Sequence, residues 1–551
     1  MATKQGATVS VRILVDEEKK RVVCAETGND FVDILFGFLT LPMGTIVRLI
    51  RKHRSELGSM SNLYRSVEAN FSLDNFRTNA CMDMLLHPRT PLETICRGLK
   101  IKVNDSEPAR YFICSDLECS RKLKVGLFSN YANSKCKCGK LMNKEIFALT
   151  SASNASEIDG VFVTRSTAYI VSDSFKITAS TPGALVKLLR NTGIKDLNCL
   201  EETVVKVGFE EILNLLERSL VSKSPLTDVF LRNQSYPPEL RLHHFLPQNI
   251  AEKATSGSMV VKIIVRKSDG KALCAEAKED FVDLLFSFLT IPLANVVNCL
   301  GGDSSLGCID NLYKSVKGLD DKWFVACSKS QSMGYPGTQS LKGLLLKPGL
   351  ASKFSCSGQH FQLEERTPTN YYLHIRFGSD VCSFTFDKIC TDLEDVLVPL
   401  TLIDPKSPRL ETSFGEFVKR PAIFVVSVGL VVLPLSGSTS SIAYLKSLDV
   451  PIDDIQERVI NISKQEALNL LKASLITTSA LNVKSLYVPI EDIKESVSIT
   501  HKQDFIKCLH QPFFGRSLRA GPDGSNTTAV VLRAANAPNC NSIFSAQPDS
   551  S

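Results

Sequence analysis

Four cysteines in the first third of the chain have a spacing that can hold a metal ion. Cys114 and Cys119 form one pair, sixteen residues follow, and Cys136 and Cys138 form a second pair directly before Gly139. Four thiolates in two close pairs are the ligands of a tetrahedral Zn²⁺ ion, and such an ion would be structural because no coordination position stays open. The alternative is four free thiols on neighbouring strands, since the spacing departs from the common C-x2-C pattern.

The same region carries the positive charge of the chain. Residues 97–145 contain eleven Lys or Arg and five Asp or Glu, and this difference of +6 equals the net charge of the whole chain. Tyr111, Phe112, Phe128 and Tyr131 lie among the basic residues. Basic residues among aromatic ones can bind single-stranded nucleic acid. They can equally solubilise a small metal-binding ribbon, so nucleic acid is an alternative partner here.

The rest of the chain shows no comparable pattern. Cys356, His360, His374, Cys382 and Cys390 lie in the corresponding part of the second half, without paired spacing. The familiar sequence strings of nucleotide-binding, serine-hydrolase, zinc-protease and calcium sites do not occur. We therefore assign no catalytic residues and no organic cofactor. The sequence favours a protein that is not an enzyme, with an enzyme of unrecognised class as an alternative.

The elements that must position the cysteines are organised by a repeat. Residues 31–40 read FVDILFGFLT and residues 281–290 read FVDLLFSFLT, with eight of ten positions identical. Their apolar residues recur at helical spacing. Asp30 can cap the first helix with Asp33 at the reciprocal position, and Asp280 and Asp283 repeat this arrangement.

Further repeats follow in the same order, about 250 residues apart. An alternating hairpin precedes each helix, NLYRSV at 62–67 recurs as NLYKSV at 311–316, and a second set of strands and helices follows in each half. We predict an α+β fold of two tandem homologous halves, each a strand–strand–helix unit followed by a second small α+β unit, with a cysteine zinc ribbon in the first half.

A shorter repeat occurs near the C-terminus. Residues 447–471 match residues 485–509 at 12 of 25 positions, a shift of 38 residues. The predicted boundaries are 1–150 for the first N-terminal unit with its ribbon, 151–232 for the second unit, and 233–258 for a linker. They continue with 259–415 and 416–484 for the units of the second half, 485–510 for a truncated strand–helix repeat, and 511–551 for a disordered tail.

Composition places the protein inside the cell. The 551 residues are 44% hydrophobic and 22% charged, as in ordinary globular proteins. No apolar signal-peptide core opens the chain, and no stretch is long and apolar enough for a transmembrane helix. Seventeen cysteines without a secretion signal indicate a reducing compartment, cytoplasmic or nuclear.

The repeated FVD helix, the NLYxSV segment and the run EALNLLKASL at residues 466–475 resemble the plant family catalogued as domain of unknown function 674. The resemblance extends from about Val9 to about Leu509 and implies a plant source and an intracellular protein. It brings no activity, substrate or catalytic residue. Duplication without catalytic patterns favours a protein-interaction or scaffold protein that binds other proteins. The alternatives are a zinc-stabilised nucleic-acid binder and an enzyme of unrecognised class.

Overall fold

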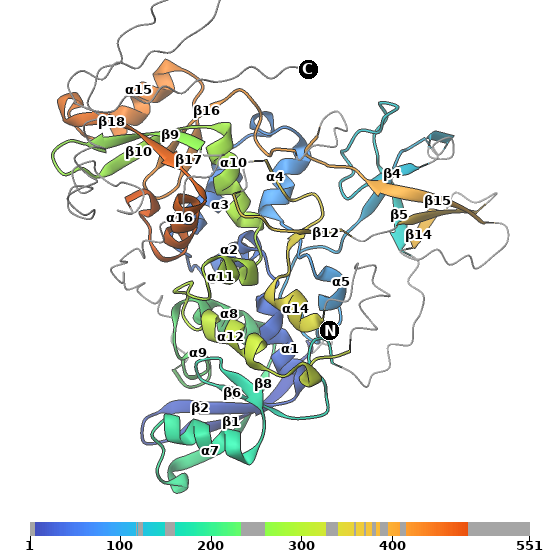
Figure 1. The fold of residues 1–551 in the computed structure, drawn as a ribbon, viewed down its shortest axis with the longest axis vertical. Coiled ribbons are helices and arrows are strands. Elements are labelled where there is room, and N and C mark those ends of the chain that lie inside the picture. The colour runs from blue at the N-terminus through green and yellow to red at the C-terminus, as the bar shows by residue number, and fades with distance from the viewer. Residues whose placement is uncertain are drawn as a thin grey trace, which may run out of the picture. The chain divides into compact units, whose positions relative to one another are not determined.

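The computed structural model describes residues 6–116, 118–119, 125–148, 160–232, 259–326, 340–357, 360–367, 371–376, 382–385, 395–407 and 415–482. In these residues the protein is a mixed α+β structure with two five-stranded sheets, a two-stranded sheet and a closed six-stranded barrel (Figure 1). The predicted linker, the truncated repeat from residue 485 and the tail lie outside the described residues.

The first five-stranded sheet is antiparallel and has the order β7-β6-β2-β1-β8. Its strands are β1 (Val9–Asp16), β2 (Arg21–Thr27), β6 (Tyr169–Ser172), β7 (Ile177–Ala179) and β8 (Leu200–Val207). The second has the order β17-β16-β10-β9-β18, again antiparallel. Its strands are β9 (Met259–Arg266), β10 (Ala272–Lys278), β16 (Ile423–Ser427), β17 (Val432–Pro434) and β18 (Ile455–Ile462). The hairpins predicted from the sequence therefore lie inside larger sheets.

The predicted boundaries near residues 150 and 415 do not separate sheets. Strands β1 and β2 come from the first expected unit and β6, β7 and β8 from the next, yet all five form one sheet. The second sheet combines β9 and β10 with β16, β17 and β18 in the same way. Alternating apolar residues show which face of a strand is buried, but they do not show which strand lies beside it.

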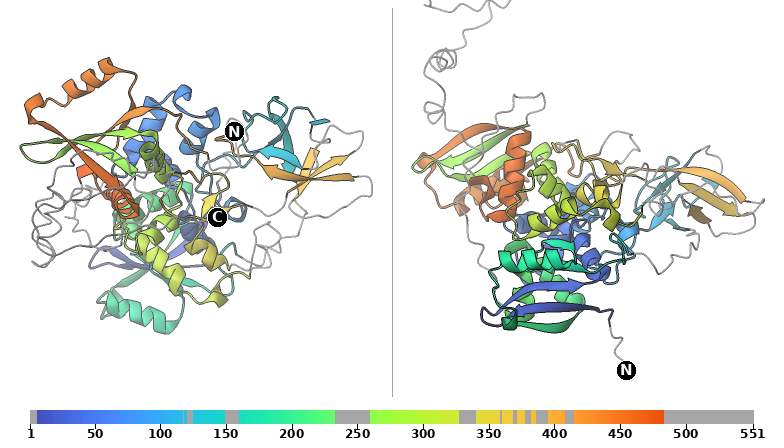
Figure 2. Two further views of the ribbon diagram at one scale, coloured as in Figure 1. Left: turned by 45° about the horizontal axis from the view of Figure 1, so that its top comes forward. Right: turned by 60° about the horizontal axis from the view of Figure 1, so that its bottom comes forward.

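Helices between and beside the sheets supply most of the core (Figure 2). Helix α1 carries the first FVD sequence and α10 the second, and Phe31 and Phe281 are buried in them. The helices are α1 (Asn29–Phe38), α2 (Met43–Arg51), α3 (Met60–Arg65), α4 (Asn79–Leu86), α5 (Glu93–Cys96), α7 (Pro182–Asn191), α8 (Phe209–Val221), α9 (Pro225–Thr227), α10 (Glu279–Ser287), α11 (Leu293–Cys299), α12 (Ile309–Gly318), α14 (Leu341–Leu346), α15 (Ser438–Ser447) and α16 (Lys464–Ile476).

The barrel joins strands that are distant in sequence. Its order is β13-β14-β5-β3-β4-β15, and exchanging β3, β4 and β5 with β13, β14 and β15 reproduces the same cyclic order. The strands are β3 (Tyr111–Ile113), β4 (Gly126–Ser129), β5 (Lys144–Ala148), β13 (Tyr372–Arg376), β14 (Cys382–Thr385) and β15 (Asp395–Leu402), while β11 (Leu350–Ala351) and β12 (Glu365–Arg366) form the two-stranded sheet. Two parallel pairings, β14 with β5 and β15 with β4, close the barrel.

The aspartate of the first FVD sequence is not a helix cap. Helix α1 has Gly28 at its N-cap and no side-chain cap hydrogen bond. Asp33 is buried and instead accepts hydrogen bonds from the backbone amides of residues 161, 162 and 163 at 2.8–2.9 Å. Because the carboxylate takes up these amides, they are not available to a sheet ladder, and the next strand, β6, begins at Tyr169. The predicted capping role of Asp30 and Asp33 is therefore wrong.

Asp283 makes the corresponding contacts from α10. It accepts hydrogen bonds from the amides of Phe417 and Val418 at 3.0 Å, both to Oδ1. Its Oδ2 is buried and has no hydrogen-bond partner among the described residues. Burial raises the pKa of Asp33 to about 6 and that of Asp283 to about 8, while the backbone amides act in the opposite direction.

The two segments held by these aspartates bind the other half of the chain. The carbonyl of Phe162 accepts a hydrogen bond from the amide of Val325 at 3.0 Å. The carbonyl of Phe417 accepts one from the amide of Arg77, also at 3.0 Å. Each aspartate therefore fixes a segment from its own half that pairs with backbone from the opposite half.

Each NLYxSV segment likewise contacts the five-stranded sheet of the opposite half of the chain. Ser66 accepts a hydrogen bond from the amide of Val432 in the second sheet, and Ser315 accepts one from the amide of Ile177 in the first, each at 2.9 Å. In the turns of those same sheets, Asn62 donates to the carbonyl of Gly429 and Asn311 donates to the carbonyl of Ser174. The two parts of the chain therefore interlock.

Asp33→Asn and Asp283→Asn should have different effects on stability. Both oxygens of Asp33 accept backbone amides, so an asparagine there must aim its NH₂ group at a buried donor, at a cost of about 1–3 kcal/mol in the free energy of unfolding. In Asp283→Asn the NH₂ group can take the place of the unpartnered Oδ2, so we expect a loss below about 1 kcal/mol. Urea unfolding at pH 6 tests this, and equal losses would contradict it.

Asp283→Asn should also change how the free energy of unfolding depends on pH. The pKa of Asp283 is raised from 3.8 to about 8, so its proton stabilises the folded state fully below about pH 4, and this contribution falls as pH rises through about 8. Between pH 6 and pH 9 the parent protein should lose more stability than Asp283→Asn, which has no proton to release there. Parallel pH profiles for the two proteins would overturn this assignment.

Cutting the chain between the halves should not separate them. A protease site inserted between residues 232 and 259 would produce two fragments that share the barrel and the reciprocal hydrogen bonds. We expect the fragments to elute together on size exclusion in buffer and apart in denaturing urea. Separate elution in buffer would show that the interlocking contacts do not hold the fold together.

Candidate metal centre

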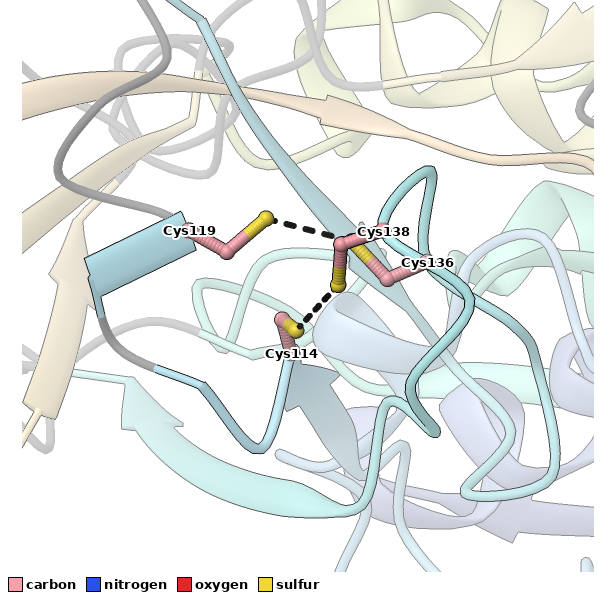
Figure 3. A group of neighbouring side chains, drawn as sticks. All are labelled: Cys114, Cys119, Cys136 and Cys138. Carbon is pink, nitrogen blue, oxygen red and sulfur yellow. Dashed lines mark hydrogen bonds between the residues drawn. The ribbon is translucent and has the colours of Figure 1, made fainter.

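Three short segments bring the predicted cysteines together at one end of the barrel strands (Figure 3). Cys114 follows the last residue of β3. Cys119 lies in a short turn in which its amide donates to the carbonyl of Asp116 at 3.1 Å. Cys136 and Cys138 lie in one hairpin turn between β4 and β5, whose arms meet in a bridge between Lys135 and Leu141. Residues far apart in the sequence thus supply one cluster.

The four sulfurs converge in the structure. The Sγ atoms of Cys114 and Cys138 are 3.5 Å apart, and those of Cys119 and Cys136 are 3.7 Å apart. All four sulfurs lie within 4.8 Å of one another. A tetrahedron with Zn–S bonds of about 2.3 Å has sulfurs about 3.8 Å apart, so the cluster has the size that a tetrathiolate site requires.

The hairpin turn depends on Gly139. Its φ of +84° lies in the left-handed region, which a glycine adopts without strain. The Gly139 amide donates to the carbonyl of Cys136, and the Cys136 amide donates to the carbonyl of Lys140, both at 2.9 Å. These two bonds fold the chain back so that Cys136 and Cys138 face Cys114 and Cys119.

One side of the cluster is buried and the other is open. Cys114 and Cys136 are buried against Met142 and Ile403, whereas Cys138 is exposed. Ile403 follows β15, and its amide donates to the carbonyl of Phe128 in β4 at 3.0 Å. The apolar floor of the site therefore comes from both sequence-distant parts of the barrel.

Without a metal ion the thiols differ in acidity. Burial raises the pKa of Cys114 to about 12 and that of Cys119 to about 11. The Lys140 amide and the Cys114 thiol lower the pKa of Cys138 to about 7. A bound cation would favour all four thiolates, because a coordinating thiol is deprotonated. The donor set is soft and purely thiol, which fits Zn²⁺ and not Mg²⁺ or Ca²⁺.

The aromatic residues of this region do not form an exposed stacking surface. Phe112 and Phe128 are buried, and the Tyr111 ring packs 4.5 Å from the ring of Phe384 in the barrel. Tyr131 is partly buried beneath Arg89. Arg110 is paired with Glu145, and Lys140 with Asp116 at 2.8 Å. Tyr111 and Phe128 of this pattern therefore pack in the barrel, and nucleic acid stays an alternative partner.

The second set of cysteines and histidines forms no cluster in the described residues. Cys356 is buried, with its sulfur 4.0 Å from the carbonyl oxygen of Asp283. His360 has its Nε2 buried without a partner among the described residues, and burial lowers its pKa. His374 and Cys382 lie on the paired strands β13 and β14, and Cys390 falls outside the described residues.

Two polar clusters gave no recognisable signal in the sequence. Lys406 has a fully buried side chain whose Nζ lies 3.2 Å from Asp404 and over the ring of Phe417. Ser55 donates to Glu217 at 2.6 Å, and His53 lies 3.5 Å from the same carboxylate. Lys406 Nζ also donates to the carbonyl of Lys353, so each cluster joins segments distant in the chain that only the folded structure brings together.

The family model described as "Protein of unknown function (DUF674)" matches residues 5–465. The chain belongs to the DUF674 family. No curated protein and no solved structure matches it. Among the helices of the described residues, none has the length and apolar character needed to cross a membrane. For this DUF674 protein, function must therefore be argued from its own residues.

The purified protein should contain about one zinc ion per chain, held by the four cysteines. Cys136→Ser removes a buried ligand and should reduce the zinc content to near zero, as measured by elemental analysis. Cys199→Ser is the matched control, because Cys199 lies outside the cluster. Cobalt substitution should give the intense thiolate-to-metal absorption of a tetrahedral site. Equal zinc in both variants would place the metal elsewhere.

Proposed function

We propose that this DUF674 protein is a non-catalytic protein-interaction protein whose barrel is stabilised by one structural Zn²⁺ ion. The observation that carries the proposal is the convergence of the Cys114, Cys119, Cys136 and Cys138 sulfurs within 4.8 Å. Four protein thiolates complete a tetrahedral shell and leave no position for water or substrate. A metal held in this way supports a fold.

The barrel benefits from such an ion because its own core is small. Its buried apolar cluster comprises nine residues, in contrast to the extensive core that the two sheets and the helices share. Small cores are commonly supplemented by a metal site. Here the ion would tie the end of β3 to the hairpin between β4 and β5.

We further propose that the chain consists of two homologous halves that interlock. The colinear repeats, the equal strand orders of the two sheets and the cyclic order of the barrel support this organisation. A duplicated surface presents any binding site twice, and two linked sites increase avidity without new contacts. This favours an interaction or scaffold role over catalysis.

The thiol chemistry supports a reducing compartment for this protein. All cysteines assigned in the described residues are free thiols, several of them buried. Zinc thiolates and unpaired cysteines persist where glutathione and thioredoxin keep thiols reduced. We therefore propose a cytoplasmic or nuclear location, with other proteins as partners.

Tagged full-length protein should recover a specific protein partner from an extract of its source. We expect the complex to form again from purified components with saturable binding and fixed stoichiometry, because an interaction protein acts through a defined surface. Analytical ultracentrifugation measures both quantities. A chain that forms no complex but turns over a small molecule would contradict the proposal and favour an unrecognised enzyme.

A further inference from the structure

Among the residues that the structure describes, each five-stranded sheet ends in a long strand that pairs on one side only. Strands β8 and β18 have eight residues each, and each pairs along its whole length with a single neighbour, β1 or β9. Neither pairing contains a bulge, and neither strand contains proline. Bulges and prolines are devices by which proteins protect sheet edges. These two edges lack both.

The hydrogen bonds at the start of each strand show which backbone groups point outward. The carbonyl of Cys199 accepts from the amide of Glu17, and the carbonyl of Asp454 accepts from the amide of Lys267. In an antiparallel ladder the residues that face the neighbour alternate with residues that face away. Val204 in β8 and Val459 in β18 are therefore outward-facing, with their amide and carbonyl groups directed away from the sheet.

The two edges carry the same side chains at equivalent positions. Val204 is 62% exposed and Val459 is 65% exposed. A glutamate precedes each by two residues, Glu202 in β8 and Glu457 in β18, and both are exposed. Arg12 pairs with Glu202 at 2.9 Å, which leaves that carboxylate 58% exposed. Each edge thus offers an aliphatic side chain next to a carboxylate, on a strand with open backbone groups.

We propose that β8 and β18 are two equivalent docking edges for an extended peptide of a partner protein, in which an aliphatic residue and a Lys or Arg lie two positions apart and so share one face of the peptide strand. The peptide would add a sixth strand to each sheet, with backbone hydrogen bonds to the outward-facing residues. Its aliphatic residues would cover Val204 or Val459, and its basic residues would meet Glu202 or Glu457. This proposal rests on the interaction role proposed above and names the chemistry of the partner.

A synthetic peptide tests the proposal directly. The probe is a fluorescein-labelled peptide of about nine residues in which every second residue is in turn valine or lysine, with threonine at the positions between, long enough to pair with one such strand. Fluorescence anisotropy with the full-length protein should show saturable binding of two peptides per chain. The same peptide with glutamate in place of lysine should bind at least tenfold more weakly, because it meets Glu202 and Glu457 with like charge.

Proline variants of the protein identify the edges. Val204→Pro and Val459→Pro each remove an outward amide that the sheet does not use, and proline is tolerated at such edge positions. Each should reduce the stoichiometry from two peptides to one, and the double variant should abolish binding. Val204→Ala and Val459→Ala are the matched controls, because they keep the amide, and each should retain two sites. Circular dichroism and melting confirm that the variants fold.

A change in the peptide makes the test independent of protein folding. N-methylation of alternate backbone amides removes donors along one edge of the peptide, so binding to the unaltered protein should fall at least tenfold. Absence of saturable binding, or binding that the double proline variant and N-methylation leave unchanged, overturns the proposal. If the protein binds its partner but does not bind the peptide, the assignment of β8 and β18 as docking edges is wrong, while the proposed interaction role still stands.

Discussion

The fold depends on two buried carboxylates that bind backbone amides. Burying Asp33 and Asp283 in the core lowers the stability of the fold unless hydrogen bonds compensate the lost hydration of each carboxyl group. Each carboxyl compensates by accepting amides from a segment that would otherwise have unsatisfied donors: residues 161–163 for Asp33 and residues 417–418 for Asp283. Those same segments pair with the opposite half of the chain through the carbonyls of Phe162 and Phe417. Each aspartate contact within one half therefore fixes a backbone contact between the halves.

The barrel and its metal centre follow from this interlocking. Strands β3, β4 and β5 join β13, β14 and β15 in one barrel, and the same two parts of the chain also exchange hydrogen bonds between their helices and sheets. The barrel order is preserved when the two sets of strands are exchanged, but the four cysteines occur in one set alone. The structural ion proposed above would therefore support the small barrel core from one set of strands only.

Local patterns in the sequence were informative and non-local ones were not. Helical spacing predicted α1 and α10, Thr181 caps α7 as its sequence indicates, and the paired cysteines converge. The sequence could not show that Asp33 binds amides about 130 residues away, so a local capping role was assigned to it instead. The hairpin pairings of β1 with β2 and of β9 with β10 are confirmed, but pairing beyond the hairpins was missed for the same reason. Alternation in β6 or β8 identifies a buried face, whereas the neighbour is chosen by the whole core. The aromatic residues near Tyr111 and Phe128 were misleading, because stacking surfaces and barrel cores use the same residue types.

The interaction role proposed above draws on the arrangement of polar and apolar groups. Charged groups in the interior, such as Lys406 with Asp404 and Glu217 with Ser55, each have a partner, which is what a stable core requires of buried charge. Two of the exposed aliphatic residues, Val204 and Val459, lie on the regular edge strands β8 and β18, whose outward backbone groups carry the proposed docking. If interlocking holds both sheets in one rigid core, two such edges keep a fixed separation. A partner with two matching segments would then gain affinity from the second contact without a further loss of rigid-body freedom.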